Sequence, residues 1–321
     1  MAKFEARSQG VSDKTKIDEI DSLKGVRLHE LLEFDVYAPS TLGEALTYLS
    51  GEGKGSRVLA GGTSLIPEMR KEGSRVTRVV DLSGLSDLRY VRKTQSTIRV
   101  GGLTTIRELA EAKIFDDRYC CFRRLEHDLG FVSTRNMATV GGNLAAGADG
   151  DLAEILLALD GQVVIRNAKS ERTAEPTNLD LAEDELVVEV RFSDLKRPVS
   201  TWFNKFEKRK ENGKGGITTT TLMKLKDDRT VEDVRIAVSR ARGRKTGRVA
   251  GAESELRGRT PDAENIGRAL DRLVAEIDPA GDFRGSSRFR KQVTRAMVKE
   301  GLGKCLEKLD HERRVEGAGQ C

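Results

Sequence analysis

The stretch that decides the fold of this chain is STRNMATVGGNLAAGADGD, residues 133–151. It places Gly141 and Gly142 inside an apolar run that is typical of a strand, and a helical pattern opening on an aspartate follows. Glycine adopts backbone conformations closed to other residues and has no Cβ to block a ligand. Thr139 and Asn143 flank the two glycines with polar side chains. The stretch therefore predicts a point where the backbone approaches a bound molecule closely.

A second glycine stretch, VLAGGTSLIPEMRKEG, raises the same expectation nearer the N-terminus. An apolar strand leads into Gly61 and Gly62, and Thr63 and Ser64 follow before a short helical pattern. Successive backbone N–H groups in such a turn form a cradle for anionic oxygens, and the hydroxyls and helix start add further donors. The loop suits a diphosphate. A tight turn without any ligand is the alternative for this loop taken alone.

Two well-known phosphate loops do not match. GEGKGSR, residues 51–57, lacks the GxxxxGK[ST] spacing and follows a helix, and no GxGxxG precedes an acidic residue some 20 positions on. Asp151 comes eight residues after Asn143, where a carboxylate could accept hydrogen bonds from ribose hydroxyls. Two glycine cradles in one domain without a dinucleotide fingerprint fit a long ligand with a central diphosphate, such as FAD.

The chain organises into four segments. Strands and helices alternate from residue 34 to residue 85, which predicts a small parallel α/β unit, and further strands and helices complete a first domain. Three strands followed by three helices then predict a small α+β domain with a three-stranded antiparallel sheet. The expected segments are an N-terminal extension (1–33), a first domain (34–196), a second domain (197–310) and a frayed tail (311–321).

Composition describes a soluble globular protein with a heavily charged surface. The 321 residues are 37% hydrophobic and 33% charged, and this length favours two domains. No apolar run approaches the roughly 18 residues of a membrane span, and no signal sequence is evident, which predicts a cytoplasmic protein. Basic residues (56) and acidic residues (51) are interspersed, so no nucleic-acid partner is expected. The densest basic run, RGRKTGR (242–248), is interpreted as a solvated turn.

The four cysteines show no CxxC spacing and no histidine partner at metal-binding spacing. The sequence therefore predicts neither a zinc site nor an iron–sulfur cluster on this chain. Adjacent Cys120 and Cys121 are expected to be ordinary thiols at a helix surface. The three histidines are expected to be structural.

Four motifs in order, LAGGTSLIPEMR, VVDLSGLSDL, IRVGGLTTIRELA and RNMATVGGNLA, resemble the FAD-binding (medium) subunit of the molybdenum hydroxylases. The resemblance extends over residues 34–309. It implies an α+β fold, in which a two-subdomain FAD-binding domain of the PCMH type precedes a small C-terminal domain. Relatives of this kind include the flavin subunits of carbon monoxide, xanthine and aldehyde dehydrogenases.

The resemblance also implies roles for individual residues. The first loop would hold the FAD diphosphate, the second would lie near diphosphate and flavin, Asp151 would bind ribose, and Lys205 would approach the flavin. A cation there would stabilise an anionic reduced flavin. No catalytic residue or metal ligand is expected. The implied cofactor-binding residues are Ala60, Gly61, Gly62, Thr63, Ser64, Leu65, Thr104, Thr139, Gly141, Gly142, Asn143, Asp151 and Lys205.

The function implied by the resemblance is electron transfer within a heteromeric oxidoreductase. A large subunit would carry the molybdenum cofactor and a small subunit two-iron two-sulfur clusters. FAD on this chain would receive the electrons and pass them to an external acceptor such as NAD or quinone.

Two alternatives stay open. A stand-alone FAD oxidase of the vanillyl-alcohol oxidase fold usually shows a histidine or cysteine for covalent flavin attachment, which is not evident here. A flavin-less scaffold subunit stays open because of the altered segment at 211–221, and a second departure from the family pattern bears on the role of Asp151. Residues 144–151 are fewer than usual, and ENGKGGITTTT (211–221) replaces an aspartate and an apolar strand.

Overall fold

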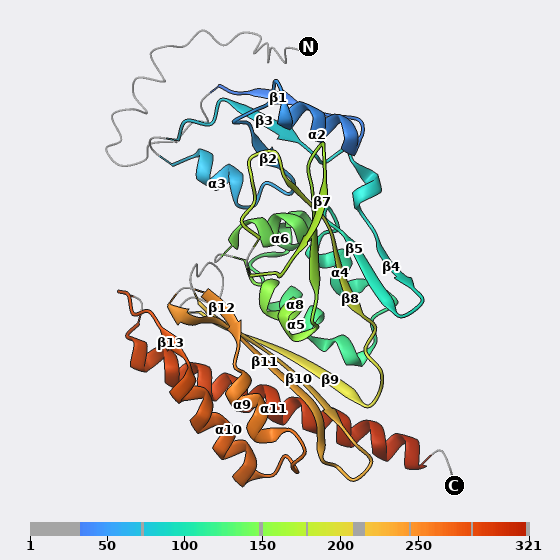
Figure 1. Ribbon diagram of the computed structural model, residues 1–321, viewed down its shortest axis with the longest axis vertical. Coiled ribbons are helices and arrows are strands. Elements are labelled where there is room, and N and C mark those ends of the chain that lie inside the picture. The colour runs from blue at the N-terminus through green and yellow to red at the C-terminus, as the bar shows by residue number, and fades with distance from the viewer. Residues whose placement is uncertain are drawn as a thin grey trace, which may run out of the picture.

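The computed structural model describes residues 33–318, with gaps at 72–73, 148–149, 178, 208–215, 244 and 284. The expected N-terminal extension therefore lies almost wholly outside the described residues. Figure 1 shows three tiers, with a small sheet at one end, a larger sheet with short helices in the middle and a third sheet with long helices at the other end.

The first tier is a parallel sheet. Its strands are β1 (Asp35–Tyr37), β2 (Arg57–Leu59) and β3 (Arg78–Asp81), in the order β1-β3-β2. Helices α2 (Leu42–Ser50) and α3 (Leu65–Met69) connect these strands. The Thr41 side chain accepts the Glu44 N–H and so caps α2. The parallel α/β prediction is confirmed.

The second tier is an antiparallel sheet in the order β4-β5-β8-β6-β7. Short helices follow the strands, and Thr105 begins one of them with a capping box to Glu108. The elements are β4 (Val91–Thr94), β5 (Thr97–Gly101), β6 (Gln162–Arg166), β7 (Glu171–Ala174) and β8 (Leu186–Ser193), with η1 (Ser86–Leu88), α4 (Ile106–Glu111), η2 (Asp117–Tyr119), α5 (Cys120–Asp128), α6 (Val132–Met137), α7 (Val140–Ala145) and α8 (Ala153–Ala158).

The third tier has more strands than the three that the sequence predicts. β9 (Val199–Phe206), β10 (Ile217–Leu225), β11 (Val231–Gly243) and β12 (Lys245–Arg248) are antiparallel, and β13 (Asp278–Pro279) pairs parallel with β11. The basic run interpreted as a solvated turn contributes β12. Its backbone pairs with β11 while its charged side chains stay at least partly exposed, so composition conceals the strand.

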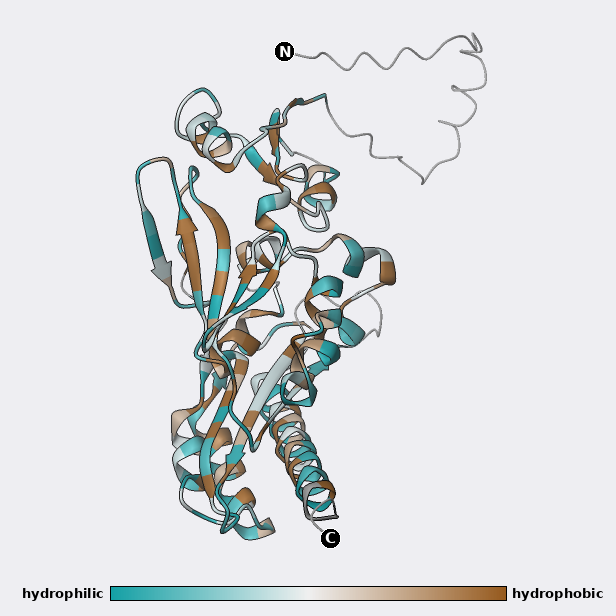
Figure 2. Cartoon of the chain, turned by 90° about the vertical axis from the view of Figure 1, so that its right-hand side faces the viewer, coloured by the Kyte–Doolittle hydropathy of each residue, from teal (hydrophilic) through white to brown (hydrophobic). Residues whose placement is uncertain are grey.

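Three helices follow in the C-terminal part. They are α9 (Ala250–Leu256), α10 (Ala263–Glu276) and α11 (Ser287–Ala318). The last of them corrects the prediction of a frayed tail from residue 311, because α11 stays helical to Ala318. In Figure 2 this long helix shows both apolar and polar residues, as expected of a helix that packs on a sheet with one side.

The second and third tiers share one hydrophobic core. Val199 and Phe203 of β9 are 2% and 0% exposed, and they belong to the same buried cluster as Phe122 of α5 and Ile155 of α8. Helices α10 and α11 cover a second cluster on β10 and β11. The third sheet is therefore buried on both faces, which is why the threonines of β10 are inaccessible.

Cys120 and Cys121 are both buried and not at a helix surface as the sequence suggests, and Cys121 belongs to the shared core. They are 8% and 0% exposed because the apolar face of α5 packs against β9. The Cys121 N–H donates to the Thr201 hydroxyl at 3.3 Å. Burial raises the pKa of the Cys121 thiol to about 12, so this sulfur is an inert packing atom.

Candidate functional site

The loop after β2 has free backbone donors. Gly62 adopts a φ of +70°, a conformation that favours glycine, and the Ile66 N–H closes the turn on its carbonyl at 3.0 Å. Within the described part of the chain, the four N–H groups from Gly61 to Ser64 donate to no backbone carbonyl. The Ser64 side chain makes no cap bond to α3. Buried or ligand-facing N–H groups require a partner, so the loop can accept an anion.

A close backbone contact joins this loop to the second glycine stretch. A Cβ added to Gly61 would lie 1.7 Å from the carbonyl oxygen of Met137, which is far inside any allowed contact. Glycine at position 61 is therefore needed for the approach of two chain segments, and not only for a ligand. This contact places the start of α7 beside the first loop.

The second glycine stretch is a helix start and not a strand. Thr139 caps α7 by accepting the Gly142 N–H at 3.1 Å. The Gly141 N–H donates to the Gly102 carbonyl at 2.7 Å, and the Asn143 N–H donates to the Thr139 carbonyl at 2.8 Å. The N–H groups that the sequence offers as a second cradle are thus used internally, and α7 contributes surface and side chains.

The two stretches line one cleft of about 620 Å³. This volume is in the range of small-molecule and cofactor sites. Ten predicted site residues lie on its wall: Ala60, Gly61, Gly62, Thr63, Ser64, Leu65, Thr139, Gly141, Gly142 and Asn143. The wall also includes Gly102, Leu103 and residues 181–183 and 185–187, none of which was predicted as a site residue. Gly102 belongs to the motif IRVGGLTTIRELA, whereas residues 181–187, which include the start of β8, have no sequence pattern that indicates a binding site.

Thr104 does not line this cleft. It is 1% exposed, and its hydroxyl both donates to the Tyr90 carbonyl at 2.9 Å and accepts the Tyr90 N–H at 3.0 Å. Its side chain therefore ties the end of β5 to the start of β4.

Asp151 and Lys205 meet next to the cleft but do not line it. The Lys205 ammonium pairs with carboxylates of Asp151 and Glu207, each at 2.7 Å. Burial lowers the pKa of Lys205, but the two carboxylates raise it by more, so the pKa lies above its usual value. The Asn143 carboxamide oxygen accepts the N–H groups of Asp151 and Leu152, both at 3.0 Å. Asn143 therefore connects the cleft wall to this ion cluster.

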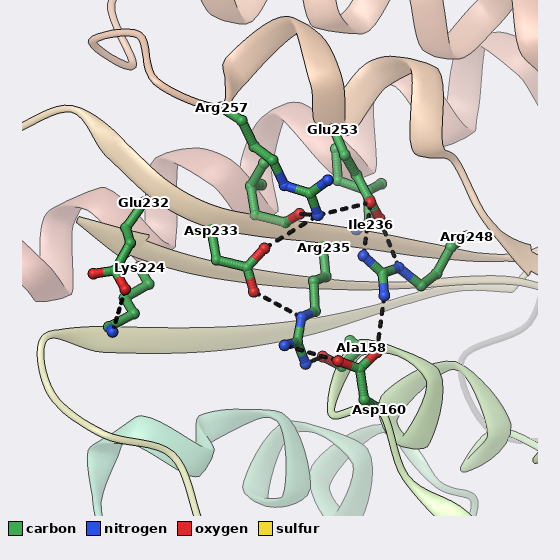
Figure 3. Close-up of polar contacts among 11 residues, drawn as sticks. Ala158, Asp160, Lys224, Glu232, Asp233, Arg235, Ile236, Arg248, Glu253 and Arg257 are labelled. Atoms are coloured by element: carbon green, nitrogen blue, oxygen red, sulfur yellow. Dashed lines mark hydrogen bonds and ion pairs between the residues drawn. The ribbon is translucent and has the colours of Figure 1, made fainter. Parts of the chain in front are cut away.

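An arginine cluster holds the other end of α8 against the third sheet (Figure 3). Arg235 donates to the Ala158 carbonyl at 3.0 Å and pairs with Asp160 at 2.8 Å. Arg248 lies between Asp160, at 2.8 Å, and Glu253 of α9, at 2.7 Å. The cluster fixes the position of α8, and thus of the ion cluster at its start, relative to β11 and β12.

Two family models match this chain. Residues 32–192 match the family model described as the FAD binding domain in molybdopterin dehydrogenase, and residues 204–305 match the CO dehydrogenase flavoprotein C-terminal domain.

The chain aligns with individual relatives over almost the whole length of those relatives. The carbon monoxide dehydrogenase medium chain of Hydrogenophaga pseudoflava is 26% identical over 277 residues, which are 84% of this chain and 96% of the relative. The 6-hydroxypseudooxynicotine dehydrogenase complex subunit alpha of Paenarthrobacter nicotinovorans is 29% identical over 294 residues, which are 87% of this chain and 98% of the relative.

The fold agrees as well. The solved structure of the carbon monoxide dehydrogenase from Hydrogenophaga pseudoflava that lacks the Mo-pyranopterin moiety matches with a TM-score of 0.80 at 24% identity, covering 87% of this chain and 99% of the other. Because the first family model alone spans half of the sequence, the resemblance inferred from the four motifs is confirmed, and this chain belongs to the family that carries the FAD-binding domain of the molybdopterin dehydrogenases.

Proposed function

We propose that this chain binds FAD in the 620 Å³ cleft and transfers electrons within a heteromeric molybdenum-containing hydroxylase. The observation that carries the proposal is the row of N–H groups from Gly61 to Ser64, which donate to no backbone carbonyl in the described residues and line that cleft. Such donors fit a diphosphate. The family of the chain supports FAD as its source.

Two groups of residues at the cleft would have different roles. The loop from Gly61 to Ser64 would hold the diphosphate, with the hydroxyls of Thr63 and Ser64 as further donors. On the same cleft, Asn143 holds the backbone at Asp151 and Leu152 just before α8, and with it the pair of Asp151 and Lys205, in a fixed place. Bound FAD would supply the step between two-electron and one-electron chemistry. The protein keeps a charged, half-enclosed surface next to it.

Partners complete the proposed path. We propose that an iron–sulfur small subunit delivers electrons and that a molybdopterin large subunit oxidises the substrate, with NAD or a quinone as the final acceptor. The relatives named above are a medium chain and a complex subunit, which supports an assembly of this kind. No helix in the described ranges is long and apolar enough to cross a membrane. A cytoplasmic complex is part of the proposal.

The test is native purification of the complex, with its visible spectrum, its FAD-to-chain ratio and its subunit count. We expect a heteromer with bound FAD and iron–sulfur absorption. A colourless chain in the same complex would support the flavin-less scaffold, and an active monomer would support the stand-alone oxidase.

A matched pair of variants locates the site. Gly62 and Gly258 both have positive φ, of +70° and +74°, but Gly258 lies outside the cleft. Gly62→Ala should lower the FAD-to-chain ratio several-fold, whereas Gly258→Ala should strain the backbone by a similar amount and keep the ratio. Equal FAD loss in both variants would contradict the assignment of the cleft.

A further inference from the structure

Glu154 is a buried carboxyl group with one oxygen that lacks a partner. It lies in the first turn of α8 and is 1% exposed. Its Oε1 accepts the Thr246 hydroxyl of β12 at 3.0 Å. Its Oε2 is buried and has no hydrogen-bond partner among the described residues. Burying an ionised carboxylate in this way is costly, so the site favours the neutral acid.

The nearest charges increase that cost. Asp151 precedes Glu154 by three residues, and Lys205 of β9 is paired with both Asp151 and Glu207. An ionised Glu154 would thus add a second negative charge beside Asp151, whose own charge is paired with Lys205. Burial and then the charge of Asp151 raise the pKa of Glu154 to about 7, and the nearby polar groups, which are its own backbone N–H and the hydroxyls of Thr246 and Thr218, lower it by less.

Among the described side chains of the strands that pack against α8, no cation forms an ion pair with Glu154. β10 places Thr218 near the carboxyl group, and β12 contributes Thr246 and the exposed Lys245. Arg235 of β11 and Arg248 of β12 are engaged with Asp160 at the far end of α8. The remaining described arginine side chain of β11, Arg240, has a contact of its own.

The carboxyl group is also one step from the cleft. Asn143 lines the cleft, and its side-chain oxygen holds the N–H groups of Asp151 and Leu152. Glu154 therefore lies behind the cleft wall, near Asp151, which in turn pairs with Lys205. A change of charge at this end of the cleft acts on Glu154 through a low-dielectric interior.

We propose that Glu154 is a proton-carrying residue of this site, whose carboxylate takes up a proton from solvent when negative charge arrives at the Lys205 end of the cleft. The source of that charge rests on the proposed function. Two electrons from the partner subunit and one proton leave bound FAD with one additional negative charge. One further proton on Glu154 would cancel it, so the charges balance: two electrons in, one proton to the flavin and one proton to Glu154.

The midpoint potential of bound FAD against pH tests the coupling in the native complex. Uptake of one additional proton per two electrons steepens the slope by about 30 mV per pH unit, because a tenfold change corresponds to that step for a two-electron couple. The wild type should show this additional slope from pH 7 upward. Glu154→Gln should lack it. Glu264→Gln, at a side chain 81% exposed on α10, should behave as the wild type.

A second variant and a second measurement distinguish a failure of the Glu154 proposal from a failure of FAD binding. Thr246→Val removes a hydroxyl that favours the carboxylate, so the steep region should begin at higher pH. In the chain without flavin, the infrared carbonyl band of a protonated carboxylic acid should be present at pH 6 and absent in Glu154→Gln.

Equal slopes in wild type and Glu154→Gln, or the absence of that band, would overturn the inference about Glu154. A chain that binds no FAD would overturn the proposed function and the coupling to flavin, while the band would still show whether Glu154 holds a proton.

Discussion

At the scale of single residues, Gly61 shows how little space separates the two loops of the cleft. Its Cα lies so close to Met137 that a methyl group there would meet the carbonyl oxygen at 1.7 Å. Backbone atoms, unlike the end of a flexible side chain, cannot move aside without shifting both loops. The cleft therefore depends on a contact between residues that are far apart in the sequence.

We expect Gly61→Ala to lower the free energy of unfolding by about 1–3 kcal/mol, the usual cost of overpacking, and to reduce FAD binding. Gly84→Ala is the matched control, because a Cβ at Gly84 meets nothing within 4 Å and its φ is not positive. Thermal unfolding and the FAD-to-chain ratio are the measurements. A fully stable, flavin-loaded Gly61→Ala protein would contradict the close contact.

Glu154 should also affect stability as a function of pH. The pKa of Glu154 is about 7 in the folded chain, against about 4.3 in an unfolded one. Between these values the folded state binds more protons, so the free energy of unfolding falls as pH rises. Wild type should lose on the order of 3 kcal/mol relative to Glu154→Gln between pH 4 and pH 8. Urea unfolding at several pH values measures the free energy of unfolding of both proteins. The same dependence on pH in wild type and Glu154→Gln would contradict the prediction.

At the scale of elements, β9 carries the packing between the second and third tiers. Phe203 is fully buried in the core that they share. Phe203→Ala should cost about 3–5 kcal/mol of unfolding free energy, as for other buried aromatic truncations. Phe131→Ala, at a side chain 47% exposed, should cost far less. Denaturant unfolding compares the two, and similar losses would mean that β9 does not hold the tiers together.

Elements with a local signal could be predicted from the sequence. Thr41 and Thr105 each precede a glutamate by three residues at a helix start, and both cap their helices as this pattern predicts. The stretch at Val140–Ala145 was misinterpreted as a strand because a short apolar run with two glycines carries no periodicity that separates helix from strand. Its Thr139 cap was the signal for a helix.

Elements that form only through pairing could not be predicted. β12 is a charged segment that becomes a strand because β11 offers it an edge, and nothing in its composition shows this. The same holds for the cleft. Residues Ala60 to Leu65 were predicted as site residues from the glycine-rich loop and the family resemblance, and they line the cleft, whereas residues 181–183 and 185–187 reach it only through the folded arrangement. Thr104 looked like a site residue, but its hydroxyl is satisfied by Tyr90.

At the scale of the whole molecule, the arginine cluster of Figure 3 links α8 to α9 across the third sheet. Glu253, whose side chain is 2% exposed, accepts the Ile236 N–H at 2.9 Å and pairs with Arg248 at 2.7 Å. Glu253→Ala should cost about 3 kcal/mol, because it leaves the buried N–H group of Ile236 without a partner and removes one of the two carboxylates that pair with Arg248.

Glu232→Ala provides the comparison for this prediction. Glu232 pairs with Lys224 at 2.6 Å in the same region, but its side chain is 42% exposed. Its loss should cost less than about 1 kcal/mol. Hydrogen exchange should show faster opening of β11 and α9 in the Glu253 variant alone. Unchanged hydrogen-exchange protection of β11 and α9 in the Glu253 variant would mean that the arginine cluster does not stabilise these elements.

The core shared by the second and third tiers has a consequence for how such chains evolve. The first family model ends at residue 192 and the second begins at residue 204, yet Leu222 and Ala237 of the second segment belong to the same buried cluster as residues of the first segment. The two segments are therefore inherited as a pair: a recombination event at that junction would combine two half-cores that were never selected together. Substitutions on β9 and on α5 should accordingly accumulate in step, and the lineage of one segment should be the lineage of the other.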